Sequence, residues 1–385
     1  MTNSRICWPK WPQYGHLERQ AVERVIESNQ LFAAEEVSQF EAEYADYLGS
    51  KFALGLGNAT EGLHLALAAL EVGVGDEVIV TPYSWISSAS CVMMQNAVPV
   101  FCDIEEESLG LDPVAIEAAI TPRTKAIVLV HMFGYPARVR EIAEIARRHR
   151  VALVEDASHV HGAIATGRKT GTFGDLSVFS LHQRKSLSVG DGGIVCTDDP
   201  TLFDTIRRLR SFGHEELSYN YRMTEFAAAI GRVGLSKLDA ENATRAANAS
   251  HLKDLLDDSG TLRVRLPREG DVGVFHAVLI DVVGDVSEID SKLLTLQGLG
   301  IPVRKTWAPL HKHPHFNPTS APARGLPWNH PDYTMRNFHI PYRDQSFPVA
   351  EHLCPDRVLE LYVHPPAGEA EMSFAAANLR EVFAE

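Results

Sequence analysis

The chain has 385 residues, of which 45% are hydrophobic and 22% charged, and its formal net charge at pH 7 is −14. This composition excludes a disordered chain and allows two domains, and the acidic balance argues against a nucleic-acid partner. No apolar run could span a membrane, the first fifteen residues lack the apolar segment of a secretory signal, and the five cysteines are scattered. We therefore expect a cytoplasmic protein without a disulfide framework, a zinc site or a membrane partner.

The first half of the chain alternates segments with the patterns of helices and strands. Two amphipathic helices, Glu18–Ser28 and Ala34–Leu48, come first. Strands are then expected at Phe52–Gly55, Glu77–Thr81, Val98–Cys102, Thr124–Val130, Val151–Glu155, Leu176–Ser180 and Gly193–Cys196. Helices are expected between them at Ala59–Leu70, Ser87–Gln95, Val114–Ala119 and Val139–His149. Strands that alternate with helices indicate an α/β fold, with a mainly parallel sheet covered on both faces.

The rest of the chain has a different organisation. Leu202–Ser211 and Thr224–Leu252 predict helices, and the second is long enough to connect two domains. Shorter strands and helices follow at Val274–Asp281, Asp285–Gly298 and Ile301–Val303. We therefore predict a large domain over residues 1–250 and a small domain over residues 251–385. The segment Pro309–Pro348, rich in Pro, His and Asn, predicts a long functional loop.

Asp156 and Lys185 are the strongest candidates for chemistry. Asp156 follows a buried strand, at the sheet edge where parallel α/β proteins bind ligands, and a buried carboxylate there needs a cation such as a protonated pyridine nitrogen. Lys185 lies in a polar loop beyond the next strand, a position that suits Schiff-base chemistry if the site lowers the pKa of its amine. A helix N-cap for Asp156 and a solvated surface side chain for Lys185 are the structural alternatives.

Two further segments would complete a cofactor site. In Gly55–Leu67 a turn of small residues leads directly into a helix, where the N–H groups of Ala59 and Thr60 can bind phosphate oxygens. This turn is not a GxGxxG dinucleotide motif. Trp85 follows a strand end, where its ring can stack on a planar cofactor. An ordinary capped helix and a tryptophan that fills the core remain the alternatives for these segments.

Other polar residues are candidates for substrate or metal contacts. The three histidines of the segment HKHPHF, which begins at His311, alternate along a loop broken by proline. Such a pattern rarely converges on one ion, so no metal is expected. Arg222 and Arg304 are candidates for binding the carboxylate of an amino-acid substrate. Tyr135 follows a strand end and is either a substrate contact or a core residue.

The segments just described occur in an order that resembles a known family, the DegT/DnrJ/EryC1/StrS aminotransferases. The resemblance is strong from Tyr44 to Leu238 and weaker through TWAPLHKHPHF, Thr306–Phe316. It implies a pyridoxal-phosphate transferase of fold type I, with a mainly parallel seven-stranded sheet and a smaller C-terminal α/β domain. Members of this family act mostly on keto-sugars and keto-cyclitols.

The resemblance also implies roles for individual residues. Lys185 would form the Schiff base with pyridoxal 5'-phosphate, Asp156 would pair with the pyridine nitrogen, and Trp85 would stack on the ring. The phosphate would be bound by Ala59, Thr60 and Ser180. His159 stands where most members have glutamine, as in the branch of cyclitol aminotransferases and 3-amino-5-hydroxybenzoate synthases.

The segment SYNYRMTEFAAAIG, Ser218–Gly231, matches the part of the family that forms a homodimer. This match implies that Asn220 reaches the phosphate in the neighbouring subunit. The loop that holds His311 would lie near the substrate pocket. The family's dehydratase branch replaces the Schiff-base lysine by histidine, so Lys185 argues against that branch.

The implied reaction moves an amino group from L-glutamine or L-glutamate to a ketone acceptor, with pyridoxamine phosphate as the aminated cofactor. The setting would be antibiotic or other secondary-metabolite biosynthesis, or glycan biosynthesis. Two alternatives stay open. One is an aromatising dehydration like that of 3-amino-5-hydroxybenzoate synthase, which His159 keeps in consideration. The other is a non-catalytic regulator that binds the same cofactor.

Overall fold

A seven-stranded sheet forms the centre of the structure, a computed structural model that describes residues 5–213, 217–316 and 341–384. The strands lie in the order β1-β9-β8-β5-β4-β2-β3. Their bounds are β1 Phe52–Leu56, β2 Glu77–Val80, β3 Val98–Phe101, β4 Thr124–Val130, β5 Ala152–Asp156, β8 Leu176–Ser180 and β9 Gly193–Thr197. Only β9 runs antiparallel to its neighbours. The predicted mainly parallel α/β sheet is therefore confirmed.

Both faces of this sheet are buried, because alternate residues of its strands belong to different hydrophobic clusters. In β4, Ile127 and Leu129 pack with α6, whereas Val128 and Val130 pack in the larger cluster with α3. The helices of this part are α1 His16–Ser28, α2 Glu35–Leu48, α3 Ala59–Ala69, α4 Ser87–Met94, α5 Pro113–Ala119, α6 Val139–His149, α7 Pro200–Arg210 and α8 Glu225–Leu256. No helix in the described ranges is long and apolar enough to cross a membrane.

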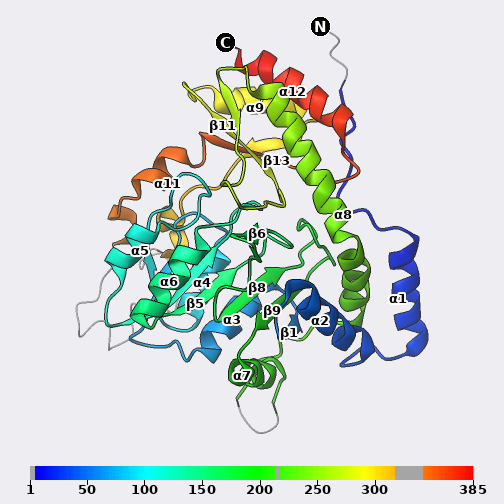
Figure 1. Cartoon of the computed structure of the whole chain (residues 1–385), viewed down its shortest axis with the longest axis vertical. Coiled ribbons are helices and arrows are strands. Elements are labelled where there is room, and N and C mark those ends of the chain that lie inside the picture. Colours follow the sequence, from blue (N-terminus) through cyan, green and yellow to red (C-terminus); the bar gives the residue numbers. More distant parts are fainter. Residues whose placement is uncertain (1–4, 214–216, 317–340, 385) are drawn as a thin grey trace.

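A second, antiparallel sheet is built from the C-terminal part of the chain. Its strand order is β10-β11-β13-β12, with bounds β10 Leu262–Val264, β11 Val278–Val282, β12 Val303–Lys305 and β13 Val358–Leu361. The helices α9 Ile289–Gly298, α11 Pro348–Leu353 and α12 Glu369–Phe383 belong to the same region. The long helix α8 contacts α1 and α2 near its start and α12 and β10 further on (Figure 1). The domain boundary near residue 250 stays a prediction, since α8 runs across it.

The expected strand Val274–Asp281 begins four residues late. Val274 and Ala277 donate backbone hydrogen bonds to the carbonyls of Gly134 and Phe133, so this stretch is tied to the segment that follows β4 before β11 begins. Gly134 has φ 102°, and a Cβ atom there would lie 2.5 Å from the backbone nitrogen of His276. Only glycine allows this approach, which fixes His276 at the junction between the two sheets.

Candidate active site

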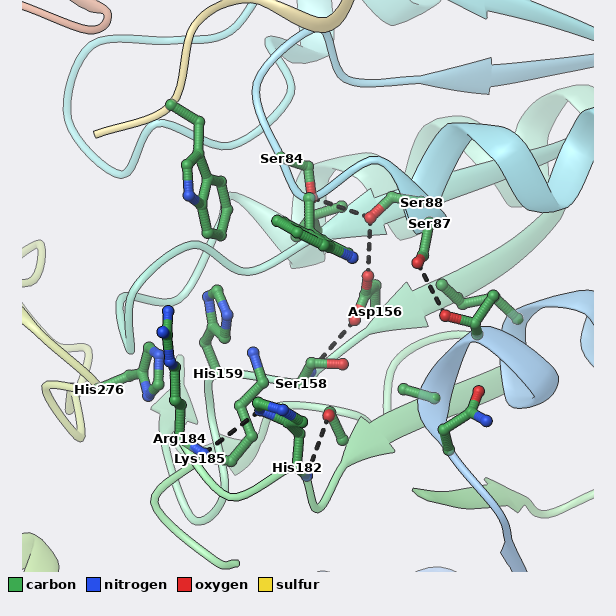
Figure 2. Close-up of a pocket in the computed structure, with 18 of the residues that line it drawn as sticks. Ser84, Ser87, Ser88, Asp156, Ser158, His159, His182, Arg184, Lys185 and His276 are labelled. Carbon is green, nitrogen blue, oxygen red and sulfur yellow. Dashed lines mark hydrogen bonds between the residues drawn. The ribbon is translucent and has the colours of Figure 1, made fainter. Parts of the chain in front are cut away.

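A cavity of ≈ 410 Å³ lies at the carboxyl ends of the central parallel strands. Val130, Asp156 and Ser180 are the last residues of β4, β5 and β8, and all three line it. The start of α3 forms another wall, and residues of β12 and β13 approach from the second sheet. The location is the one at which open α/β sheets bind their ligands, and Figure 2 shows the polar side chains that face this space.

Eight of the residues singled out in the sequence line this one cavity. They are Ala59, Thr60, Trp85, Asp156, His159, Ser180, Lys185 and Arg304. They come from five separate segments, so their convergence is a property of the fold and not of sequence spacing. Four other candidates do not line it: Tyr135, Asn220, Arg222 and His311.

Asp156 presents a buried carboxylate with spare acceptor capacity. The side chain is 6% exposed; Ser88 Oγ donates to its Oδ2 at 2.9 Å, and the Ser158 N–H donates to its Oδ1 at 3.3 Å. No helix begins at this position, so Asp156 is not a helix N-cap. The neighbouring Glu155 has no such spare capacity, because its carboxylate oxygens are hydrogen-bonded to His131 and to three backbone N–H groups. A cationic N–H donor in the cavity would complete the hydrogen bonding of Asp156.

Lys185 combines partial burial with access to the same cavity. Burial lowers the pKa of its amine from 10.5 to about 8, against an opposing effect of Asp156 and Glu360. Its backbone is held on both sides, because Trp11 Nε1 donates to the Lys185 carbonyl at 2.9 Å and the Lys185 N–H donates to the His182 carbonyl at 2.8 Å. Lys185 is therefore not a solvated surface lysine, and a share of its amine is unprotonated near neutral pH.

This depressed pKa predicts how the amine reacts as pH changes. Only the free amine attacks an aldehyde, so reaction is suppressed below the pKa and reaches its limit above it. Reductive methylation of the protein without added cofactor, resolved by peptide mass spectrometry, should show Lys185 labelling rise with a midpoint near pH 8. Labelling of Lys253, whose pKa is raised by its hydrogen bond with Asp257, should still be rising above that pH. Superimposable profiles for the two lysines would contradict the effect of burial.

The start of α3 is shaped to receive an anion. Asn58 caps the helix by accepting from the Glu61 N–H at 2.9 Å, which leaves the first-turn N–H groups of Ala59 and Thr60 without intrahelical partners. Gly193 of β9 lies so near that a Cβ atom there would be 2.5 Å from the Asn58 carbonyl carbon. Ser180 lines the same corner of the cavity. N–H groups, a helix dipole and a hydroxyl together suit a phosphate group.

Aromatic rings form the remaining walls. Trp85 is 61% exposed and meets Trp307 edge-on at 6.0 Å between ring centroids, so it is not a core tryptophan. His159 stacks on His276 with centroids 4.3 Å apart, and its Nδ1 accepts from the Phe133 N–H at 3.1 Å. Burial holds the pKa of His159 well below its usual range, so the ring is neutral at physiological pH. These rings offer flat surfaces to a planar ligand.

Tyr135 and His311 have structural roles in this arrangement. The Tyr135 hydroxyl is buried, donating to the Arg265 carbonyl and accepting from the Leu279 N–H, both at 3.1 Å. Its aromatic ring therefore joins the two sheets from within the core. His311 is buried and pairs with Glu351 at 2.9 Å. Neither side chain lines the cavity.

The other two histidines of the HKHPHF segment, His313 and His315, are exposed and contact each other at 3.1 Å between Nδ1 atoms. Across the described ranges, no group of three His, Cys, Asp or Glu side chains is arranged to hold a metal ion. Residues 317–340 of the predicted long loop lie outside the described part of the chain.

Arg222 and Asn220 lie just before α8, on the surface. The Arg222 guanidinium lies between the rings of Phe32 and Phe212, at 4.1 and 4.3 Å from their centroids, and its Nε donates to Asn220 Oδ1 at 3.0 Å. Both aromatic side chains are exposed. This exposed apolar surface is available for contact with another molecule.

The sequence analysis missed several residues that line the cavity. They are Arg184, His276, Trp307, Glu360 and Tyr362. Arg184 adjoins Lys185, so its place could have been inferred from that neighbour. The others come from the second sheet and its approaches, and only the packing of one sheet against the other brings them to the cofactor-type residues.

The comparisons agree with this geometry. Residues 12–365 match the model of the DegT/DnrJ/EryC1/StrS aminotransferase family. An L-glutamine:2-deoxy-scyllo-inosose aminotransferase from Streptomyces kanamyceticus is 36% identical over 346 residues, covering 81% of this chain and 80% of that relative. The X-ray structure of an aminotransferase from Psychrobacter cryohalolentis superposes with TM-score 0.89 and 30% identity, covering 98% and 99% of the two chains.

A crystal structure of 3-amino-5-hydroxybenzoic acid synthase is also similar, with TM-score 0.86, 28% identity and coverage of 98% of this chain and 99% of that one. The family match over residues 12–365 extends across both sheets and every segment that lines the cavity. The chain therefore belongs to the DegT/DnrJ/EryC1/StrS family and is an aminotransferase.

Proposed function

We propose that this enzyme uses pyridoxal 5'-phosphate to transfer an amino group from L-glutamine or L-glutamate to a keto-cyclitol or keto-sugar. The observation that carries the proposal is the convergence of Lys185, with its depressed pKa, and the buried carboxylate of Asp156 on one cavity beside an anion-binding helix start. The relative from Streptomyces kanamyceticus, whose acceptor is 2-deoxy-scyllo-inosose, supports a cyclic polyhydroxy ketone. Biosynthesis of a secondary metabolite or of a glycan is the setting that we propose.

The cavity suits this cofactor residue by residue. Asp156 lacks a cationic partner that a protonated pyridine nitrogen would provide, and the first turn of α3 with Ser180 offers donors for a phosphate. Lys185 would bind the aldehyde carbon. Trp85 and the neutral ring of His159 would bracket the flat ring. When bound, the cofactor supplies an electron sink that stabilises a carbanion on the substrate.

The residues of this chain supply the proton transfers. The Lys185 Nζ would take a proton from the α-carbon of the donor and pass it to the aldehyde carbon of the cofactor, and a pKa of about 8 suits both transfers near neutral pH. Asp156, held in place by Ser88, would keep the ring nitrogen protonated, because an opposite charge nearby favours the cation. The aromatic walls restrict water around the reacting atoms.

Product analysis tests the proposed reaction against its rivals. The purified enzyme with pyridoxal phosphate, L-glutamine and scyllo-inosose should form an amino-cyclitol in which an amine replaces the ketone oxygen and every ring hydroxyl of scyllo-inosose is retained. The alternative, aromatising dehydration, draws support from the likeness to 3-amino-5-hydroxybenzoic acid synthase. With scyllo-inosose that reaction would instead remove two molecules of water and yield a product with new aromatic absorbance. A regulator would bind the cofactor and form neither product.

We further propose a homodimer in which Asn220 contributes to the neighbouring subunit's cavity. Asn220 is exposed and does not line the cavity of its own chain. Its side chain accepts a hydrogen bond from Arg222, which contacts the exposed rings of Phe32 and Phe212, and contact with a second subunit would cover this surface. The five cysteines are unpaired, which supports a reducing, cytoplasmic location.

Subunit mixing tests the shared site. Asn220→Ala should weaken cofactor binding roughly 10- to 100-fold, the usual effect of losing a hydrogen bond to a charged group. Mixed dimers of Lys185→Ala and Asn220→Ala chains would contain one intact site, so random mixing of equal amounts should restore roughly a quarter of the wild-type sites. If Asn220 serves the cavity of its own chain, the mixture will show no recovery beyond the two variants measured separately.

A further inference from the structure

The basic residues around the cavity differ sharply in whether they are already paired. Arg304 forms an ion pair with Glu360 and donates to the Tyr362 hydroxyl at 2.5 Å. Lys305 pairs with Asp290 at 2.6 Å and Asp356 at 3.1 Å. Arg184 is different, since no ion-pair partner for it occurs in the described parts of the chain. Among the arginines that line the cavity, Arg184 is therefore the one available to an anionic substrate.

Arg184 is also in the right place relative to the chemistry. It precedes Lys185, both side chains line the cavity, and Figure 2 shows them extending from adjacent positions toward the same space. An amino-acid donor must bring its α-amino group to the atom that Lys185 releases, and its α-carboxylate is attached to the same carbon. A planar guanidinium beside the lysine can bind that carboxylate through two parallel hydrogen bonds.

Glu360 supplies a second, complementary feature. Glu360 is 1% exposed, and its Oε1 accepts a hydrogen bond from Arg304 Nε. Its other carboxylate oxygen, Oε2, has no hydrogen-bond partner in the described structure. The same side chain lines the cavity and lies near enough to Lys185 for its charge to raise the pKa of that amine. A buried carboxylate oxygen without a partner is costly, so a ligand that donates a hydrogen bond to it is favoured.

L-glutamine and L-glutamate differ only in whether the end of the side chain can donate a hydrogen bond to Glu360. The side-chain amide of L-glutamine carries two N–H donors, whereas the carboxylate of L-glutamate only accepts and would be repelled by Glu360. We propose that Arg184 binds the α-carboxylate of the donor and that Glu360 Oε2 accepts from its side-chain amide, so that the enzyme selects L-glutamine over L-glutamate. This inference rests on the proposed transamination and adds residues that fix its donor.

The test follows the first half of the reaction in the holoenzyme, as the loss of its visible absorbance after mixing with each donor. Wild-type enzyme should prefer L-glutamine. Glu360→Gln keeps the shape and the contact with Arg304 but can donate to a carboxylate, so the glutamine-to-glutamate ratio of kcat/KM should fall roughly 10- to 100-fold. Arg184→Met should lower kcat/KM for both donors by roughly 30- to 100-fold and leave their ratio unchanged.

Lys305→Met is the matched control, because the Lys305 amine lines the cavity but is already paired with two carboxylates. This substitution should change kcat/KM for either donor by less than roughly fivefold. The inference fails if Arg184→Met behaves like this control, or if Glu360→Gln leaves the donor ratio at its wild-type value. If Glu360→Gln affects only the half-reaction with the ketone, Glu360 contacts the acceptor and not the donor, and this result also overturns the inference. If wild-type holoenzyme reacts with no amino acid, the proposed function itself fails, and this outcome is distinct from failure of the inference about the donor.

Discussion

Lys185→Ala is expected to lower the transamination rate by about four orders of magnitude, the upper range for loss of a positioned general acid–base group. The variant removes both the amine that holds the cofactor and the group that moves the proton. The cavity itself should persist, because the hydrogen bonds that fix this loop are made by the Lys185 backbone with Trp11 and His182. The measurement is single-turnover amine transfer with L-glutamine and a cyclic ketone.

Lys125→Ala is the control, since Lys125 is an exposed residue at the start of β4 and should react at the wild-type rate. The apoproteins of both variants should melt at the wild-type temperature. Residual activity of Lys185→Ala within about tenfold of wild type would mean that another base performs the transfer, and would remove the reason for assigning a function to this cavity.

Asp156→Asn should have the second-largest effect. The substitution keeps the shape of the side chain and its contact with Ser88 but removes the negative charge that faces the cavity. Breaking a buried charge pair costs about 3–5 kcal/mol, which corresponds to a loss of roughly 150- to 5,000-fold in kcat/KM. Part of the loss should appear as weaker pyridoxal-phosphate binding, which equilibrium titration of the visible band measures.

Glu155→Gln separates this effect from a general loss of stability. Glu155 is the adjacent buried carboxylate, yet its oxygens are bonded to His131 and to backbone N–H groups away from the cavity. We expect Glu155→Gln to lower the melting temperature, whereas Asp156→Asn should lower cofactor affinity while the apoprotein melts normally. The opposite pattern for the two variants would show that Asp156 is a structural residue.

The central sheet was predictable because its signals are local. The continuous apolar runs of β4 and β5, each followed by a helical pattern, place parallel strands without knowledge of the tertiary fold. The sequence of β9 does not reveal its antiparallel direction, because all of its residues are buried, as they are in β8 beside it. The late start of β11 arises from backbone bonds to Phe133 and Gly134, which lie far away in sequence.

The same distinction, between local sequence signals and contacts of distant segments, explains which site residues were predicted. Asp156 was found because it ends a recognisable strand and Lys185 because it follows one, whereas Ser180 was named only through the family resemblance. Glu360 carries no local signal, as it stands within an apolar strand whose neighbours are buried in the second sheet. Tyr135 was a candidate on the same strand-end argument that succeeded for Asp156, but its hydroxyl is bonded to backbone groups in the core. Position at a strand end locates a site but does not show which way a side chain faces.

The most direct test of the account is the visible absorbance of the purified protein after addition of pyridoxal phosphate, recorded before and after L-glutamine, beside Lys185→Ala. The account predicts a yellow Schiff-base band in the wild-type protein that bleaches when the donor is added, and a Lys185→Ala protein whose spectrum matches free cofactor. A wild-type protein that forms no such band would contradict the assignment of Lys185 and Asp156 to a cofactor site.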